Sequence, residues 1–252
     1  MKKANWKKVG CVTLFIAIVA YITASVILFS GKREDRMCTK ARAVILDSTI
    51  LKFINEQDII NILQEDELFR NGSKASTINE AHIEACLAKK SRIKKAECYL
   101  TADGADKCIL QVAVTQRKPV LRVMTDHANY YIDSDGEVMK VTERFAAFVP
   151  IVTGSVSEKF AKTDLYEFAM FLKNDNFWDA FVEQIDVNSS HELTIVPRVG
   201  NQLIKMGTID NYQQKLEKLL AVYHNGFNKI GWNKYKEINL MYDEQVVCTK
   251  ND

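Results

Sequence analysis

Residues 93–119 read IKKAECYLTADGADKCILQVAVTQRKP and set the architecture around them. Two runs with a strand-like composition, Ile93–Thr101 and Cys108–Arg117, flank the tripeptide Ala102-Asp103-Gly104. Asp-Gly between two such runs is a strong hairpin signal, because glycine accepts the positive φ that a tight turn requires. Pro119 then fixes φ and removes a backbone donor, which is typical of a border between structural units. The stretch therefore predicts two antiparallel strands that end at a domain junction.

Upstream of this hairpin, the pattern predicts one strand and two helices. Residues 43–46 (AVIL) indicate a short strand. Asn55 is a good N-cap for a helix in INEQDIINILQED, and Asn79 is a good N-cap for a second helix in NEAHIEACLAKK. The order β-α-α-β-β predicts a small α+β module over residues 43–118, with a three-stranded sheet covered by two helices.

Downstream of Pro119, short strands alternate with turn signals. Helices are expected over residues 164–173 and in YQQKLEKLLAVYHN, which starts at Tyr212. The expected strands cover residues 128–133, 137–139, 181–188, 192–196, 202–206, 235–242 and 245–249. Residues 119–252 therefore predict a mainly antiparallel β-sheet domain with two helices, and the chain as a whole belongs to the α+β class.

The N-terminal region predicts a membrane anchor. Residues 9–29 (VGCVTLFIAIVAYITASVILF) carry no charge, and as a helix they would span roughly 31 Å, close to the ~30 Å hydrocarbon core of a bilayer. A cleaved signal peptide is the alternative, but it would have a shorter apolar run that ends in small residues. We expect a cytoplasmic tail over residues 1–8, a single transmembrane helix over 9–29 and a juxtamembrane linker over 30–42.

Composition excludes several classes of protein. The 34 Lys and Arg residues nearly balance the 32 Asp and Glu residues, whereas a nucleic-acid-binding protein would show a basic excess on one face. With 47% hydrophobic residues, 10 Gly and 3 Pro, the chain is neither disordered nor of low complexity. Six cysteines in 252 residues are too few for a fold built on disulfides.

The sequence carries no recognisable catalytic or metal-binding motif. Its four histidines are scattered, without a second ligand type at metal spacing: His82, His127, His191 and His224. Asp133 and Asp135 fall in a turn, where Asp bonds its own backbone, and an acid/base pair there is disfavoured. We therefore predict no catalytic residue, no metal, no cofactor and no small-molecule substrate.

The cysteines leave two alternatives open. Cys248 near the end of a strand, with His127 and Arg198 elsewhere, is the residue set of a sortase-type cysteine transpeptidase, but Gln-Val-Val precedes the cysteine where that signature has Thr-Leu-x-Thr. Cys98 and Cys108 would face each other across the first hairpin, so they are either a cross-strand disulfide or small buried apolar residues.

Four motifs in order resemble the bacterial cell-division family FtsQ/DivIB, and the small module resembles a POTRA domain. Residues 116–120 (QRKPV) resemble its Glu-Arg-x-Pro-Val/Ala junction, and 130–136 (YYIDSDG) resemble its Tyr-x-x-Asp-x-x-Gly hairpin. Residues 148–154 (FVPIVTG) and 238–242 (INLMY) resemble its Leu-Pro-x-Leu-x-Gly segment and its Val-Asp-Leu-Arg-Tyr strand. The departures are Gln116, Asn239 and Met241, which stand where Glu, Asp and Arg are usual.

The resemblance implies a non-enzymatic divisome scaffold that recruits the partners FtsB and FtsL. It implies an inner-membrane protein with a cytoplasmic N-terminus and the bulk of its chain in the periplasm. Strand addition at the edge of the C-terminal β domain is the expected mode of binding. The residues carried over to that edge are Tyr242, Gln245, Val246, Val247 and Cys248.

Two other interpretations accompany these expectations. The terminal segment could be an ordinary edge strand that only packs on the core. The whole chain could instead be a POTRA-bearing periplasmic chaperone or secretion-partner subunit that binds extended polypeptide. For Arg117 and Pro119, at the domain junction, a structural role is expected.

Overall fold

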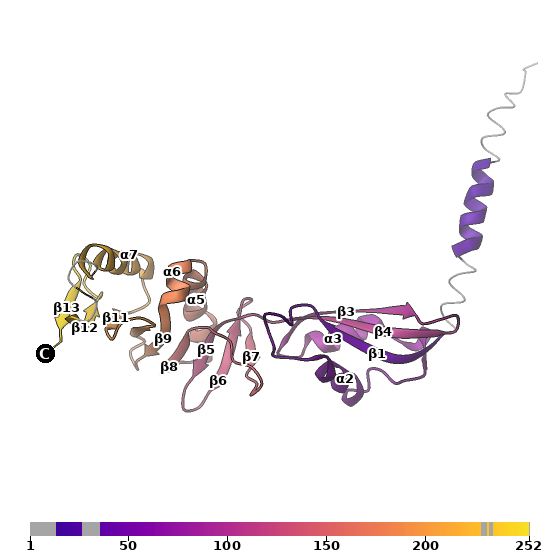
Figure 1. Cartoon of the computed structure of the whole chain (residues 1–252), viewed down its shortest axis with the longest axis horizontal. Helices are drawn as coiled ribbons and strands as arrows, with labels where there is room; N and C mark the ends of the chain where they lie inside the picture. The colour runs from indigo at the N-terminus through magenta and orange to yellow at the C-terminus, as the bar shows by residue number, and fades with distance from the viewer. Residues whose placement is uncertain (1–13, 27–35, 228–230, 232–233, 252) are drawn as a thin grey trace, which may run out of the picture. The chain divides into compact units, whose positions relative to one another are not determined.

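The computed structural model describes residues 14–26, 36–227, 231 and 234–251 (Figure 1). The chain divides into two compact units. The N-terminal unit comprises Met1–Leu46 and Ile54–Thr115, and the C-terminal unit comprises Asp47–Phe53 and Gln116–Asp252. The short segment between the first strand and the first helix of the N-terminal unit therefore belongs to the C-terminal unit.

Residues 14–26 form a helix whose apolar side chains are largely exposed. The predicted membrane span, residues 9–29, extends past this helix at both ends, and residues 9–13 and 27–29 lie outside the described residues. The predicted tail, residues 1–8, lies outside them as well. Within the described part of the chain, no helix is long and apolar enough to cross a membrane.

The N-terminal unit contains a four-stranded sheet in the order β2-β1-β4-β3. Its strands are β1 (Met37–Ile45), β2 (Ser73–Lys74), β3 (Ile93–Ala102) and β4 (Lys107–Gln116). The sheet has one strand more than predicted, because the two-residue β2 pairs antiparallel with Met37 and Cys38. β1 runs parallel to β4 and begins at Met37 rather than at Ala43, so part of the predicted linker lies in the sheet.

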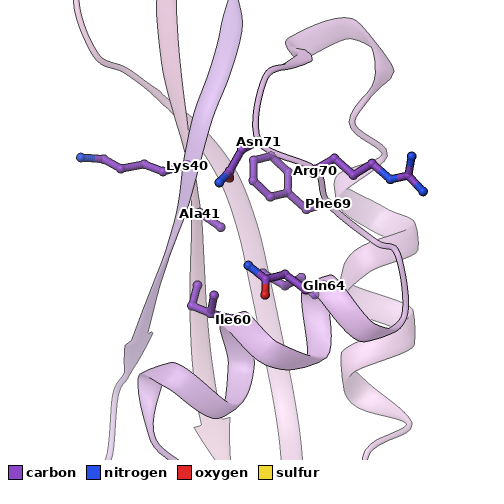
Figure 2. Close-up of a pocket in the computed structure, with 8 residues that line it drawn as sticks. Lys40, Ala41, Ile60, Gln64, Phe69, Arg70 and Asn71 are labelled. Carbon is purple, nitrogen blue, oxygen red and sulfur yellow. The ribbon is translucent and has the colours of Figure 1, made fainter.

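Both predicted helices of this unit are confirmed. In α2 (Glu56–Glu65), Asn55 and Asp58 form a capping box, with bonds of 2.8 and 2.9 Å between each side chain and the other residue's backbone N–H. In α3 (Glu80–Ala88), the Asn79 side chain accepts from the backbone of His82. A single turn of 3₁₀ helix, η1 (Ala75–Thr77), precedes α3. A small pocket opens between α2 and β1 (Figure 2).

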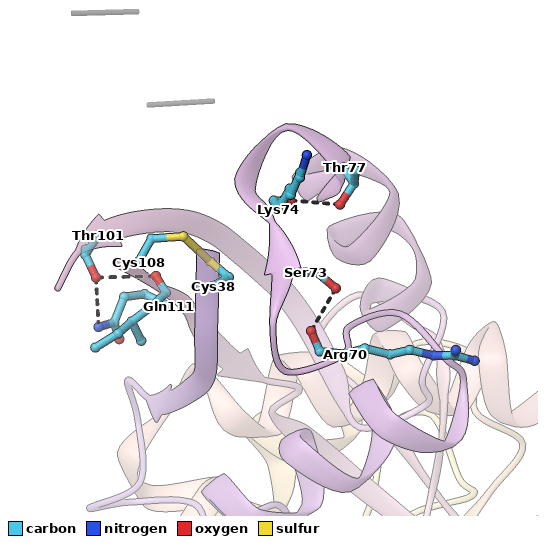
Figure 3. The surroundings of a disulfide bond; sticks show 9 residues. Cys38, Arg70, Ser73, Lys74, Thr77, Thr101, Cys108 and Gln111 are labelled. Atoms are coloured by element: carbon cyan, nitrogen blue, oxygen red, sulfur yellow. Dashed lines mark hydrogen bonds between the residues drawn. A yellow bond between two sulfur atoms is a disulfide. The ribbon is translucent and has the colours of Figure 1, made fainter. Parts of the chain in front are cut away.

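A disulfide joins Cys38 of β1 to Cys108 of β4, with a Cα–Cα distance of 4.5 Å (Figure 3). The two cysteines are partners in the parallel ladder and are 70 residues apart in sequence. A Cys98–Cys108 disulfide, one of the two alternatives above, is therefore wrong. The other alternative, small buried apolar residues, is confirmed for Cys98, which is a buried free thiol, and is wrong for Cys108, which is bonded to Cys38.

The C-terminal unit contains a nine-stranded sheet in the order β13-β12-β11-β10-β9-β8-β5-β6-β7. The strands are β5 (Pro119–Met124), β6 (Asn129–Asp133), β7 (Val138–Lys140), β8 (Ile151–Gly154), β9 (Val182–Val187), β10 (Leu193–Pro197), β11 (Leu203–Gly207), β12 (Tyr235–Asn239) and β13 (Val247–Lys250). Three neighbouring pairs are parallel, namely β5 with β8, β8 with β9 and β11 with β12. The sheet is thus mixed, although its other pairs are antiparallel as expected.

The helices of this unit are more numerous than predicted. Over its described residues they are α4 (Glu158–Lys162), α5 (Asp164–Lys173), α6 (Asn176–Phe181), α7 (Tyr212–Val222) and a π-helical turn, η2 (Tyr223–Phe227). The two extra α-helices are short and start at side-chain caps. Ser157 accepts from the backbone of Phe160, and Asp175 accepts from the backbone of Phe177. The apolar faces of α5 and α7 belong to the same core as the sheet, so these helices cover it.

The domain junction is held by buried polar contacts within the C-terminal unit. The Gln116 side chain is fully buried, and its Nε2 donates to the Leu51 carbonyl at 2.9 Å and to Asp47 Oδ1 at 3.1 Å. Both partners are acceptors, so an amide is needed where the family motif usually has Glu. Phe53, at the end of the same segment, packs edge-on against the ring of Tyr131.

Arg117 forms a buried ion pair next to this contact. Its guanidinium donates to Asp133 Oδ2 at 2.7 Å, and the Asp133 side chain is 1% exposed. The other carboxylate oxygen of Asp133 accepts from the backbone N–H groups of Asp135 and Glu137, which closes the β6–β7 turn. Pro119 begins β5 directly opposite Asp133. The ion pair therefore ties Arg117, two residues before β5, to the β6–β7 hairpin.

Candidate partner-binding edge

β13 forms one end of the nine-stranded sheet and pairs on one side with β12. On its other side, the described residues supply no strand. The backbone N–H of Asn251 donates to Lys234, on the β12 side. Because backbone groups alternate along a strand, the N–H groups of Val247 and Thr249 also point to β12, and those of Cys248 and Lys250 point to the open edge.

The five predicted binding residues are divided between this strand and the loop before it. Val247 and Cys248 lie in β13, whereas Tyr242, Gln245 and Val246 lie in the connection between β12 and β13. The predictions that Tyr242, Gln245 and Val246 lie on strands are wrong, because β12 ends at Asn239 and β13 begins at Val247. The β12 strand ends early, because the Asn239 side chain accepts from the backbone of Met241 and turns the chain away from the ladder.

A lysine of α7 holds this loop in place. Lys218 Nζ donates to the backbone carbonyls of Tyr242, at 2.8 Å, and of Asp243, at 3.2 Å. Tyr242 is 48% exposed, so its side chain stays available at the surface while its backbone is tethered. The sequence gives no local signal for this contact, because 24 residues separate the lysine from Tyr242.

An open groove of about 590 Å³ runs between α7 and the start of β13. It is lined by Lys218, Ala221, Val222, Asn225, Gly226, Phe227, Tyr235, Glu244, Gln245, Val246 and Cys248. Val246 and Cys248 are half-buried and pack against the core, whereas Val247 is exposed. The edge therefore combines two outward N–H groups with a partly apolar groove beside them.

Burial shifts the pKa of three groups near the edge, those of Cys248, Tyr223 and Lys215. Burial raises the pKa of the Cys248 thiol, which keeps it protonated and a poor nucleophile at neutral pH. Burial also raises the pKa of Tyr223 to about 12, against the opposing effect of a hydrogen bond from Gln202 Nε2. Burial lowers the pKa of Lys215, which donates to the Thr208 carbonyl.

The three residues of the transpeptidase alternative are not assembled. His127 lies in the turn between β5 and β6, and strands β8 to β12 separate that hairpin from β13. The Arg198 guanidinium stacks over the ring of Phe148, 3.6 Å from its centroid. Among the residues described, no group of three or more His, Cys, Asp or Glu could hold a metal ion.

A small sheet under two capped helices, followed by a large mixed sheet whose last strand, β13, pairs on one side only, defines a two-unit α+β protein. Comparison with protein families gives a consistent result. The POTRA-like domain model matches residues 36–111, and the model described as FtsQ/DivIB, C-terminal related, matches residues 118–249. The chain belongs to the FtsQ/DivIB family. No curated protein matches it closely.

Proposed function

We propose that this chain is a non-catalytic scaffold of bacterial cell division that recruits partners of the FtsB and FtsL type by strand addition to β13. Membership of the FtsQ/DivIB family, whose members are non-enzymatic division proteins, supports the scaffold role. The observation that carries the binding mode is the open edge of β13, with the N–H groups of Cys248 and Lys250 directed outward.

Strand addition at this edge follows from the arrangement of its groups. A partner strand that pairs with β13 receives hydrogen bonds from the two outward N–H groups, and these supply affinity with little sequence preference. Selectivity comes from side chains: alternate residues of the partner lie over the exposed Val247 or toward the groove beside α7. Tyr242, on the tethered loop, extends the contact surface past the strand.

The proposal places the chain in the inner membrane by a single helix over residues 9–29. Its N-terminus lies in the cytoplasm, and both units lie in the periplasm. The Cys38–Cys108 disulfide supports this topology, because disulfides persist in oxidising compartments and are rare in the cytosol. Family membership supports membrane anchoring in the division machinery.

The chaperone or secretion-partner interpretation would use the same kind of edge. The match to the FtsQ/DivIB C-terminal domain, over residues 118–249, favours the division scaffold. A pull-down with FtsB- and FtsL-type proteins separates the two functions. A chaperone would bind unrelated extended peptides equally well, whereas a scaffold would select its division partners.

Lys250→Pro in the full chain is the sharpest test of the binding edge. Proline removes the outward N–H and is tolerated on edge strands, so the fold should survive. Lys250→Ala is the matched control, because it removes the same charge and keeps the N–H. We expect Lys250→Pro to lose the partner and Lys250→Ala to retain it. Equal binding by both variants would show that partners do not add to β13.

Side-chain variants test the same surface. Val247→Lys and Tyr242→Lys change exposed positions and should weaken binding while the unit stays folded. Val246→Lys is less informative, since Val246 packs against the core and its replacement would also destabilise the unit.

A further inference from the structure

One face of the nine-stranded sheet packs on α5 and α7, whereas the side chains of the other face stay at least partly exposed on β10 and β11. On these two strands the paired core residues Ile195 and Ile204 are fully buried. Because side chains alternate along a strand, their neighbours Val196 and Leu203 lie opposite each other on the open face. Leu203 is 41% exposed, so this end of the face is apolar and accessible.

Two further apolar side chains lie at the same end of the sheet. Phe148, shortly before β8, is 82% exposed, and Val199, in the turn after β10, is 64% exposed. The start of β8, the end of β10 and the start of β11 meet at this end, because β8 is parallel to β9 and both β9 and β11 are antiparallel to β10. Single exposed apolar residues are ordinary, but a group of them marks an interaction surface. We call this group the Phe148 surface and define it as Phe148, Val196, Arg198, Val199 and Leu203.

Hydrogen bonds on both sides of Phe148 hold the segment that carries it. Before Phe148, the Ala147 N–H donates to the Tyr131 hydroxyl at 3.3 Å. After it, the Pro150 carbonyl accepts from the Arg122 N–H at 2.9 Å. The exposed ring therefore lies on a fixed segment, which lowers the entropy lost when a partner binds.

The turn between β10 and β11 is fixed as well. The Arg198 N–H donates to the Phe181 carbonyl at 2.8 Å, and the fully buried Gln202 donates from Nε2 to the Tyr223 hydroxyl at 2.8 Å. Gly200 has a φ of +93°, and a Cβ there would lie 2.3 Å from Gln202 Oε1, so the turn requires glycine at this position. The exposed Val199 lies between these anchored residues.

Arg198 carries a positive charge that the described residues do not neutralise. Its guanidinium stacks over Phe148, 3.6 Å from the ring centroid. Its Nε is buried without a hydrogen-bond partner, and in the described part of the chain Arg198 forms no ion pair. The stack fixes the plane of the guanidinium, and its other N–H groups lie in that plane. A carboxylate that meets this edge would pair with a cation that is already oriented.

The rest of the open face carries both signs of charge. The exposed carboxylate of Asp186 accepts from Thr153 Oγ1 at 2.7 Å, and Lys205 Nζ donates to Thr194 Oγ1 at 3.3 Å. Asp186 would repel an anionic lipid surface, whereas a protein offers charges of both signs at different positions. The arrangement therefore favours a protein partner over a membrane.

We propose that the Phe148 surface docks a partner protein that places an apolar side chain against Phe148 and Val199, and a carboxylate of Asp or Glu on the Arg198 guanidinium. Aromatic and arginine side chains are the types that dominate binding energy at protein interfaces. Strand β12 lies between this surface and β13. The Phe148 surface is thus a second interaction site of the C-terminal unit, and it does not depend on the proposed function.

The test introduces the photoreactive residue benzoylphenylalanine at Val199 of the full chain, in the cells that produce it. The matched control carries it at Glu167, which is also exposed but lies on α5, the helix that covers the opposite face. We expect an adduct with one partner protein from Val199 alone. Arg198→Glu and Phe148→Ala should each reduce its yield about tenfold, and Arg198→Lys should reduce it less, because lysine keeps the charge but loses the planar fork.

Charge exchange tests the paired carboxylate directly. The crosslinked segment of the partner is mapped by mass spectrometry and synthesised as two fluorescent peptides, one with its Asp or Glu and one with Lys in its place. The acidic peptide should bind the unchanged full chain more tightly, and the Lys peptide should bind the Arg198→Glu variant more tightly. Urea unfolding followed by Trp178 fluorescence checks that the variants keep their fold.

Four results would overturn the proposal: an adduct from Val199 no stronger than that from Glu167, an adduct unchanged by Arg198→Glu, a crosslinked segment without Asp or Glu, and an adduct with phospholipid or with a second copy of the chain. Lys250→Pro, which blocks the β13 edge, should leave the adduct unchanged, so this test and that of the division partners give separate answers. Loss of the adduct in Lys250→Pro would also overturn the proposal, because the partner would then depend on β13.

Discussion

Replacing Gln116 with Glu would restore the residue that the family motif usually has, and we predict that it destabilises this chain. The Gln116 side chain is fully buried, and its Nε2 donates to two acceptors, the Leu51 carbonyl and Asp47 Oδ1. A carboxylate donates to neither and would lie at hydrogen-bond distance from the Asp47 carboxylate. The substitution changes no volume, so its effect is electrostatic.

The magnitude follows from the contacts that are lost. Two hydrogen bonds contribute about 2 kcal/mol together, and burial of a second negative charge beside the Asp47 carboxylate adds about 2 kcal/mol more. We therefore expect the free energy of unfolding of the C-terminal unit to fall by roughly 4 kcal/mol at pH 7. Burial beside Asp47 would hold the pKa of the introduced carboxyl above its unfolded value of about 4.3.

The pH dependence provides a second readout. The folded variant binds more protons than the unfolded variant between the two pKa values, so its stability falls as pH rises through that window. The loss should therefore be smaller near pH 4 than at pH 7. Urea unfolding of the full chain, followed by the fluorescence of Trp178 in the core of the C-terminal unit, measures both values.

Two control variants make the result interpretable. Gln184→Glu makes the same change in the same unit, where the partly buried Gln184 amide donates to Thr153 Oγ1 at 2.9 Å, and it should lose only about 1 kcal/mol. Asp47→Asn should recover part of the loss when combined with Gln116→Glu, because the repulsion disappears. A loss below about 1 kcal/mol for Gln116→Glu, or no rescue by Asp47→Asn, would refute this reasoning.

Three further predictions concern other polar and sulfur groups. Arg117→Met should lower the free energy of unfolding of the C-terminal unit by about 3 kcal/mol in a urea titration, because Asp133 would keep its charge in the core without a cation. Arg117→Lys should recover part of this lost stability. Full stability of Arg117→Met would contradict the buried ion pair. Reducing the Cys38–Cys108 disulfide, or replacing both cysteines with Ser, should lower the stability of the N-terminal unit by about 4 kcal/mol, given the 70-residue separation; an unchanged thermal unfolding midpoint would argue against the bond. Cys248 should react with iodoacetamide at pH 8 more slowly in the folded chain than in urea, and Cys248→Ser should retain partner binding; a fast folded-state reaction would contradict its raised pKa.

The sequence predicted the helix starts and hairpin turns, whose positions depend on residues only a few places apart in the chain. Asn55 and Asn79 identified the starts of α2 and α3, because capping involves residues three positions apart. The hairpin signals around Gly104 and Gly136 were equally reliable, since both glycines have positive φ. These predictions needed no knowledge of tertiary structure.

Features that depend on distant pairing could not be predicted in this way. Cys38 meets Cys108 because two parallel strands lie in one register, and no local pattern specifies that register. The candidate binding edge shows the same contrast between features set by local sequence and features set by distant contacts. Val247 and Cys248 were placed on a strand by their composition, whereas the position of Tyr242 depends on Lys218 of α7, which approaches only in the folded unit.

Residues 47–53 lie between two segments of the N-terminal unit in sequence but belong to the C-terminal unit, and this limits how the chain can be divided and assembled. The polypeptide leaves the N-terminal unit after β1, contributes Leu51 and Phe53 to the core of the other unit, and returns at Ile54. A fragment that starts at Gln116 would lack the acceptors of the Gln116 amide, and a fragment that stops before Gln116 would expose two apolar side chains. Neither fragment therefore keeps all the contacts that its residues make in the intact chain. During synthesis, residues 47–53 emerge early and must wait for the strands that follow Pro119, so the C-terminal unit completes its core only with a segment made long before it.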